Sequence, residues 1–148
     1  MTSFASYPGN APEFLVKGYR WASLGDATVV DVGGSEGKYS VALAQAFPDL
    51  NFIVQDLPEV VKAVESKPRP TEVSDRISFM PHSMFEQQPV TADIYLFRWI
   101  FHDWPDKYVV KILSQLVPAM KTGARVIISE VILPEPNTLS LLQEKKVR

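Results

Sequence analysis

Five short apolar runs, separated by stretches of helical character, constrain the fold of this sequence more than any other feature. Each run has the length of a strand, and this alternation is typical of βαβ units and a largely parallel sheet. The sequence therefore predicts an α/β fold with about five mostly parallel strands flanked by helices. The predicted strands are residues 28–32, 51–55, 77–80, 93–98 and 125–133.

Four helices are expected around these strands. The strongest signal comes from a stretch whose apolar residues repeat at helical spacing and fall on one face. The predicted helices are residues 11–24, 38–47, 58–66 and 105–120. We expect Asp103 to cap the last of these, Pro105 to occupy its first turn and Gly123 to end it. Because Pro118 lies far inside it, we also expect a break near Val117.

Length and composition exclude several classes of protein. With 148 residues, the chain has room for one domain of ordinary size. Its net charge of -2 provides no basic surface for nucleic acid or an anionic membrane. The sequence has no cysteine and only two histidines, which excludes thiolate chemistry and a zinc site built from several such ligands. No signal peptide or long apolar segment is recognisable, so a cytoplasmic location is expected by default.

A cluster of glycines follows the first predicted strand and leads directly into a helix. Asp31 is followed by Gly33, Gly34 and Gly37, and this spacing does not match the G-x-G-x-x-G fingerprint of dinucleotide-binding proteins. A carboxylate at this position repels phosphate but attracts an ammonium or a sulfonium. These residues therefore favour S-adenosylmethionine as the ligand, although the glycines alone are also compatible with a simple tight turn.

Asp56 lies at the carboxyl end of the second predicted strand. A carboxylate there can accept hydrogen bonds from both hydroxyls of a ribose. The alternative is that Asp56 only caps the following helix. Because Asp56 accompanies the glycine cluster, we favour the cofactor interpretation.

His102 follows the fourth predicted strand, and Glu130 lies at the carboxyl end of the fifth run. If these strands are neighbours, the two side chains face the same crevice. An imidazole gains and loses a proton near neutral pH, and a carboxylate beside it can fix its tautomer. Asp103 could also assist His102. Trp99 and Trp104 could stack on a flat substrate, although we favour a core position for both, and His82 is expected at the surface.

These residues resemble the catalytic domain of the S-adenosylmethionine-dependent O-methyltransferases of the caffeate and flavonoid type, above all their fungal secondary-metabolite relatives. The resemblance covers nearly the whole chain, and the Phe-His-Asp-Trp block around His102 is its most specific part. It implies a Rossmann-like class I methyltransferase core over residues 1–148. The matching blocks are residues 29–37, 52–58, 93–106, 111–113 and 123–134.

The resemblance also implies a role for each site residue. Gly33, Gly34 and Gly37 would line the methionine end of the cofactor, Asp56 the ribose and Arg98 its outer edge. His102 would take the proton from a hydroxyl of a small phenolic, enolic or polyketide-like substrate, and Glu130 would orient it. No metal is implied.

Three departures from the family pattern stand out. Ser83 occupies a position where the family usually has an aspartate that contacts the adenine, which predicts weaker cofactor binding. Nothing in the sequence corresponds to the N-terminal dimerisation domain, or to the C-terminal end with its antiparallel hairpin. Without the hairpin, the fifth strand becomes an open sheet edge, so we expect self-association or a partner chain. The alternative function is an inactive, cofactor-binding partner subunit.

Overall fold

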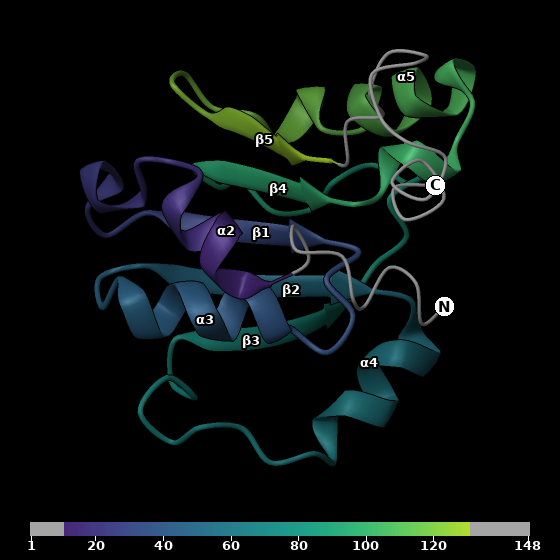
Figure 1. Ribbon diagram of the computed structural model, residues 1–148. Helices are drawn as coiled ribbons and strands as arrows, with labels where there is room; N and C mark the ends of the chain where they lie inside the picture. Colours follow the sequence, from purple (N-terminus) through teal and green to yellow (C-terminus); the bar gives the residue numbers. More distant parts are fainter. Residues whose placement is uncertain (1–10, 131–148) are drawn as a thin grey trace, which may run out of the picture.

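The five predicted strands form one sheet in the order β3-β2-β1-β4-β5, and every neighbouring pair is parallel. The computed structural model describes residues 11–130, and Figure 1 shows the sheet with helices packed against it. The predicted α/β fold class is therefore confirmed. The strands are β1 (Thr28–Val32), β2 (Asn51–Asp56), β3 (Ile77–Pro81), β4 (Ile94–Arg98) and β5 (Arg125–Ser129).

The sheet is buried on both faces, which explains why its central strands are apolar along their whole length. Val29 belongs to a core that includes Leu15 and Leu43, whereas Val30 belongs to a second core that includes Ile112. The first core lies beneath α2 (Pro12–Lys17) and α3 (Lys38–Ala46), which contact each other, and the second lies beneath α5 (Asp106–Ser114) (Figure 1). The helices are α2 (Pro12–Lys17), α3 (Lys38–Ala46), α4 (Pro58–Glu65) and α5 (Asp106–Ser114), with short 3-10 turns η2 (Trp21–Leu24), η3 (Phe101–Asp103) and η4 (Val117–Ala119).

The single helix predicted for residues 11–24 is wrong, because the chain breaks between α2 and η2. The indole N–H of Trp21 donates a hydrogen bond to the carbonyl of Leu15 at 2.9 Å. This bond turns the chain back on itself and buries Trp21, which is only 1% exposed. Burial of one large aromatic side chain thus outweighs continuation of a regular helix.

The break predicted near Val117 is present, because α5 ends at Ser114 and Pro118 lies in η4. The predicted cap is wrong. Pro105 precedes α5 in an extended conformation, and no side chain caps the helix. Asp103 lies in η3 instead, where its carboxylate faces His102. Gly123 is not the helix end either, since it lies in the turn before β5 with a φ of +86°.

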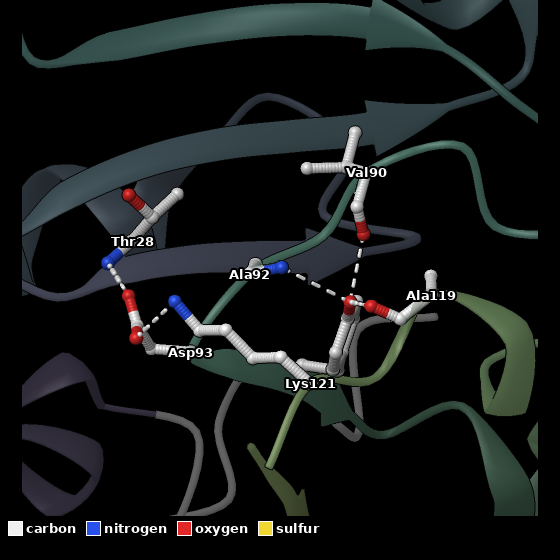
Figure 2. A network of polar contacts seen from close by, with 7 residues as sticks. Thr28, Val90, Ala92, Asp93, Ala119 and Lys121 are labelled. Atoms are coloured by element: carbon white, nitrogen blue, oxygen red, sulfur yellow. Dashed lines mark hydrogen bonds and ion pairs between the residues drawn. The ribbon is translucent and has the colours of Figure 1, made fainter. Parts of the chain in front are cut away.

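A polar network fastens the end of the sheet opposite the carboxyl ends of the strands (Figure 2). Asp93 accepts the backbone N–H of Thr28 at 2.8 Å and pairs with Lys121, also at 2.8 Å. The buried hydroxyl of Tyr95 accepts the N–H of Ala92 and donates to the carbonyl of Val90 at 2.7 Å, with the carbonyl of Ala119 farther away at 3.3 Å. These bonds satisfy backbone groups where the loops enter the sheet. The carboxyl ends of the strands, where ligands bind in open α/β sheets, lie at the other end.

No helix among residues 11–130 has the length and apolar character needed to cross a lipid bilayer.

Candidate active site

The glycine turn after β1 has the shape it has because only glycine fits at three of its positions. Gly33 and Gly37 have φ values of +70° and +76°, a region that other residues rarely adopt. Gly34 is required for a different reason, since a Cβ there would lie 2.6 Å from the carboxylate of Asp31. The N–H groups of Gly33 and Gly34 both donate to the carbonyl of Gln55 at 2.8 and 3.1 Å, which ties the turn to β2.

Asp31 lies directly beneath this turn and is 4% exposed. Its carboxylate accepts a hydrogen bond from the hydroxyl of Ser40 at 2.7 Å. Burial raises the pKa of Asp31 to about 6, although the Ser40 hydrogen bond and the positive charge of Arg98 act in the opposite direction. Asp31 therefore supports the glycine turn from below and places a carboxylate against Gly34.

Asp56, at the end of β2, is held in a fixed orientation by two backbone amides. Its Oδ2 accepts the N–H of Ser35 at 2.9 Å and its Oδ1 accepts the N–H of Leu57 at 2.8 Å. Ser35 adopts a positive φ of 53°, which is uncommon for a residue other than glycine and which directs its N–H at the carboxylate. Each oxygen keeps a second lone pair, so Asp56 can still accept two hydroxyl hydrogen bonds.

A cavity of about 400 Å³ opens beside Asp56, between the carboxyl ends of β1, β2, β3 and β4. Its volume is in the ordinary range for a small-molecule site. Three predicted cofactor residues, Gly33, Asp56 and Ser83, line this cavity, whereas Asp31, Gly34, Gly37 and Arg98 do not. The other lining residues are Leu57, His82, Met84, Phe85, Ile100, Asp103 and Trp104.

The cavity corrects two expectations. His82 is not a surface residue, because it is half-buried, lines the cavity and keeps Nε2 out of contact with solvent. Trp104 is not a core residue, since it is 36% exposed and forms part of the cavity wall. Its ring meets that of Phe85 edge to face, with 4.9 Å between centroids. One signal could have identified these residues from the sequence, because each lies just beyond the carboxyl end of a predicted strand.

Ser83 lies at the start of the loop that forms one side of the cavity. Its hydroxyl oxygen accepts the N–H of Phe85 at 3.3 Å, and its carbonyl accepts the N–H of Glu86 at 3.0 Å. The hydroxyl proton of Ser83 remains available for donation. Ser83 therefore shapes the loop and contributes one short polar group to the cavity.

His102 and Glu130 meet because β4 and β5 are neighbours, which confirms the condition on which their contact was expected. Oε2 of Glu130 lies 2.9 Å from Nδ1 of His102, and its Oε1 accepts the backbone N–H of Phe101 at 2.8 Å. The side chain of His102 is 29% exposed and that of Glu130 is 19% exposed. A half-buried carboxylate on Nδ1 favours the tautomer in which Nε2 carries no proton. Such a nitrogen can act as a general base.

Arg98 lies between the glycine turn and the His102–Glu130 pair. Its guanidinium lies over the ring of Tyr39, 3.7 Å from the centroid, and 4.6 Å from the ring centroid of Trp99. Burial lowers the pKa of Arg98, while the negative charges of Asp31 and Glu130 oppose that effect. Arg98 thus places a positive charge between the glycine turn and the His102 pair. It does not line the cavity beside Asp56.

Trp99 adopts a positive φ of 56° immediately after β4. Its N–H donates to the carbonyl of Ser129 at 2.8 Å, and its ring stands edge-on to His102, with 6.3 Å between centroids. A non-glycine residue in this region costs of order 1–3 kcal/mol, and such strain is concentrated at functional sites. The strained turn is what directs the chain from β4 into the segment that carries His102.

Comparison with known proteins identifies the family of this chain. Residues 16–146 match the O-methyltransferase domain family. The chain is 66% identical over its full length to the grayanic acid biosynthesis cluster O-methyltransferase of Cladonia grayi, and 48% identical to the O-methyltransferase VdtC of Byssochlamys spectabilis. It spans only 33% and 35% of those two relatives, about a third of their length.

A solved structure extends this likeness to a ligand-bound protein. NcsB1, an O-methyltransferase from neocarzinostatin biosynthesis, was crystallised with S-adenosylmethionine and 2-hydroxy-5-methyl naphthoic acid. It superposes with a TM-score of 0.70 at 34% identity, over 80% of this chain and 36% of its own.

Proposed function

The chain belongs to the O-methyltransferase domain family, and on that basis we propose that residues 1–148 are the catalytic core of an enzyme that transfers a methyl group from S-adenosylmethionine to a hydroxyl of a small phenolic, enolic or polyketide-like molecule. The observation that carries this proposal is the His102–Glu130 contact of 2.9 Å at the same end of the sheet as the cavity beside Asp56. A secondary-metabolite pathway is the setting suggested by the relatives. The cytoplasmic location stays a prediction from the sequence.

The residues present fit the cofactor. The oriented carboxylate of Asp56 suits a ribose, the apolar wall of the cavity suits a purine ring, and Gly33 presents backbone without a side chain to the cavity. We assign Gly34, Gly37 and the charge of Asp31 to the methionine end of the cofactor. Arg98 lies between the glycine turn and the His102–Glu130 pair and is assigned to positioning the cofactor there. When bound, S-adenosylmethionine supplies an electrophilic methyl group on a sulfonium.

His102 acts as the general base in this proposal. Nε2 takes the proton of the substrate hydroxyl as the oxygen becomes nucleophilic, and Glu130 keeps the Nδ1–H in place and stabilises the imidazolium that results. The remainder of the catalytic effect comes from holding the reacting oxygen in line with the methyl group.

Calorimetry with S-adenosylmethionine tests the cofactor site, and absence of binding would overturn the proposal. Transfer of a labelled methyl group to a panel of phenols tests the reaction. We expect transfer to fall by about 10²–10⁴-fold in His102→Ala, with cofactor binding unchanged. Lys107→Ala, an exposed substitution on α5 that does not line the cavity, is the control. Binding without transfer would support a non-catalytic partner subunit instead.

A further inference from the structure

The base nitrogen of His102 already has a partner in this structure. Oδ1 of Asp103 lies 3.2 Å from Nε2, on the opposite side of the ring from Glu130. Nε2 is the atom that would receive the substrate proton under the proposed function. The position of Asp103 therefore bears directly on whether that atom is accessible.

The two carboxylates around His102 differ in their surroundings. Glu130 is half-buried and anchored by the N–H of Phe101, whereas the side chain of Asp103 is 66% exposed. Asp103 also lines the cavity beside Asp56. An anchored carboxylate fixes the ring, while an exposed one on a short 3-10 turn can rotate away at little cost.

We propose that Asp103 is a positioning residue that occupies Nε2 of His102 when the ring is protonated and leaves it when a substrate hydroxyl binds there. A neutral ring with its proton on Nδ1 presents only a lone pair at Nε2, which repels a carboxylate and accepts a hydroxyl. After Nε2 has taken the substrate proton, the Nε2–H again donates to Asp103. The proton is then released from the ring to water. This inference rests on the proposed function.

Within residues 11–130, three charged groups bear on His102. They are Glu130 after β5, Asp103 within η3 and, through Glu130, the guanidinium of Arg98 at the end of β4. Because the sequence has only two histidines, the ring signals of His102 can be assigned with a single His82→Gln variant. The experiment is an NMR titration of the ¹⁵N-labelled chain that reads both ring nitrogens.

In the wild-type protein, we expect Nε2 to lose its proton before Nδ1, the reverse of the preference of free imidazole. Asp103→Asn should change the ¹⁵N signal of Nε2, because it removes the carboxylate that lies 3.2 Å from this atom. Asp106→Asn is the matched control, since it removes the same charge from an exposed position three residues away and should shift that signal much less. Equal shifts in the two variants, or an Nε2–H tautomer in the wild type, would overturn the inference.

Kinetics provide a second measurement that a purely structural role would not affect. If Asp103 competes with the substrate for Nε2, then Asp103→Asn should lower KM for the phenol at the acid end of the pH range, where more of the ring is protonated. An unchanged KM across the pH range would contradict the competition. These results are separable from failure of the proposed function, which would appear as absence of cofactor binding in the wild type.

Discussion

Glu130 holds His102 by its Nδ1 atom at 2.9 Å while its other oxygen is fixed by the N–H of Phe101. This double attachment sets the orientation of the carboxylate before any substrate arrives. Glu130→Gln should keep the fold, because the amide oxygen can still accept one of the two hydrogen bonds. We expect methyl transfer to fall at least about 10-fold, since a neutral amide stabilises an imidazolium less well. The measurement is labelled methyl transfer, with calorimetry to show that S-adenosylmethionine still binds.

Glu86→Gln is the control for this prediction, because it removes an exposed carboxylate from the loop beyond Ser83. Equal activity of Glu130→Gln and the wild type would show that Glu130 is not needed to orient or stabilise the ring.

Asp56 should be the main determinant of affinity for the cofactor. Its carboxylate is held by the N–H groups of Ser35 and Leu57 with lone pairs left for a ribose. Asp56→Asn replaces charge-assisted hydrogen bonds, which are worth about 1.5–3 kcal/mol each, with weaker ones. We expect the Kd for S-adenosylmethionine to rise by roughly 10- to 100-fold in calorimetry. Asp49→Asn, an exposed variant on the loop before β2, should leave it unchanged; a similar Kd in Asp56→Asn would place the ribose elsewhere.

Ser83 offers a gain-of-affinity test. Its hydroxyl accepts the N–H of Phe85 at 3.3 Å, and an aspartate oxygen can make the same hydrogen bond. Ser83→Asp should therefore preserve the loop and add a second, longer acceptor to the cavity. A gain of about 1 kcal/mol would tighten the Kd for S-adenosylmethionine by roughly five-fold. Ser83→Asn controls for size without charge, and weaker binding of Ser83→Asp would argue against an adenine contact at this position.

The fold could be predicted from the sequence because its signals are local and mutually consistent. All five strands and their parallel direction follow from apolar runs separated by helices. The contact between His102 and Glu130 was expected only if the fourth and fifth strands are neighbours, and the structure supplies that pairing. The roles of the residues that close the cavity were predicted less well. The position of His82 and Trp104 beyond strand ends is visible in the sequence, but their orientation depends on the conformation of the loops that carry them.

The roles of acidic residues were hardest to predict, because a carboxylate near a helix start has several possible partners. Asp103 was expected to cap α5. The N-cap position is instead Pro105, two residues later in an extended conformation, and Asp103 pairs with His102. Asp31 was expected to face the glycine turn, and its carboxylate does lie against Gly34. For Asp103, backbone geometry, which no single residue type specifies, decides the partner.

The buried carboxylate of Asp31 should make stability depend on pH. Its pKa is raised from 3.8 to about 6, so the folded state binds a proton more tightly than the unfolded chain. The resulting contribution to stability is fully present below about pH 4 and is lost as the pH rises through about 6. Asp31→Asn should therefore raise the free energy of unfolding at pH 8 by roughly 3 kcal/mol and change it little at pH 4.

Denaturant unfolding at the two pH values measures this difference, and calorimetry on the same variant measures its cost in cofactor affinity. We expect Asp31→Asn to bind S-adenosylmethionine more weakly, because the charge beneath the glycine turn attracts the ammonium. Asp26→Asn, a variant in the turn before β1, is the control. A stability gain that is the same at pH 4 and pH 8 would show that burial of the ionised Asp31 carboxylate does not destabilise the folded state.

The outer edge of β5 should promote association between copies of this chain. Among residues 11–130 this strand pairs only with β4, and Ile128 on it is 51% exposed. An apolar strand with unpaired backbone groups is a template for pairing with another chain, and a lysine on such an edge discourages it. Ile128→Lys should lower the average mass of the purified chain in size-exclusion chromatography with light scattering. Val110→Lys, at a 66% exposed position on α5, adds the same charge away from the edge and should not. A monodisperse monomer in the wild type would show that this edge is protected without a partner.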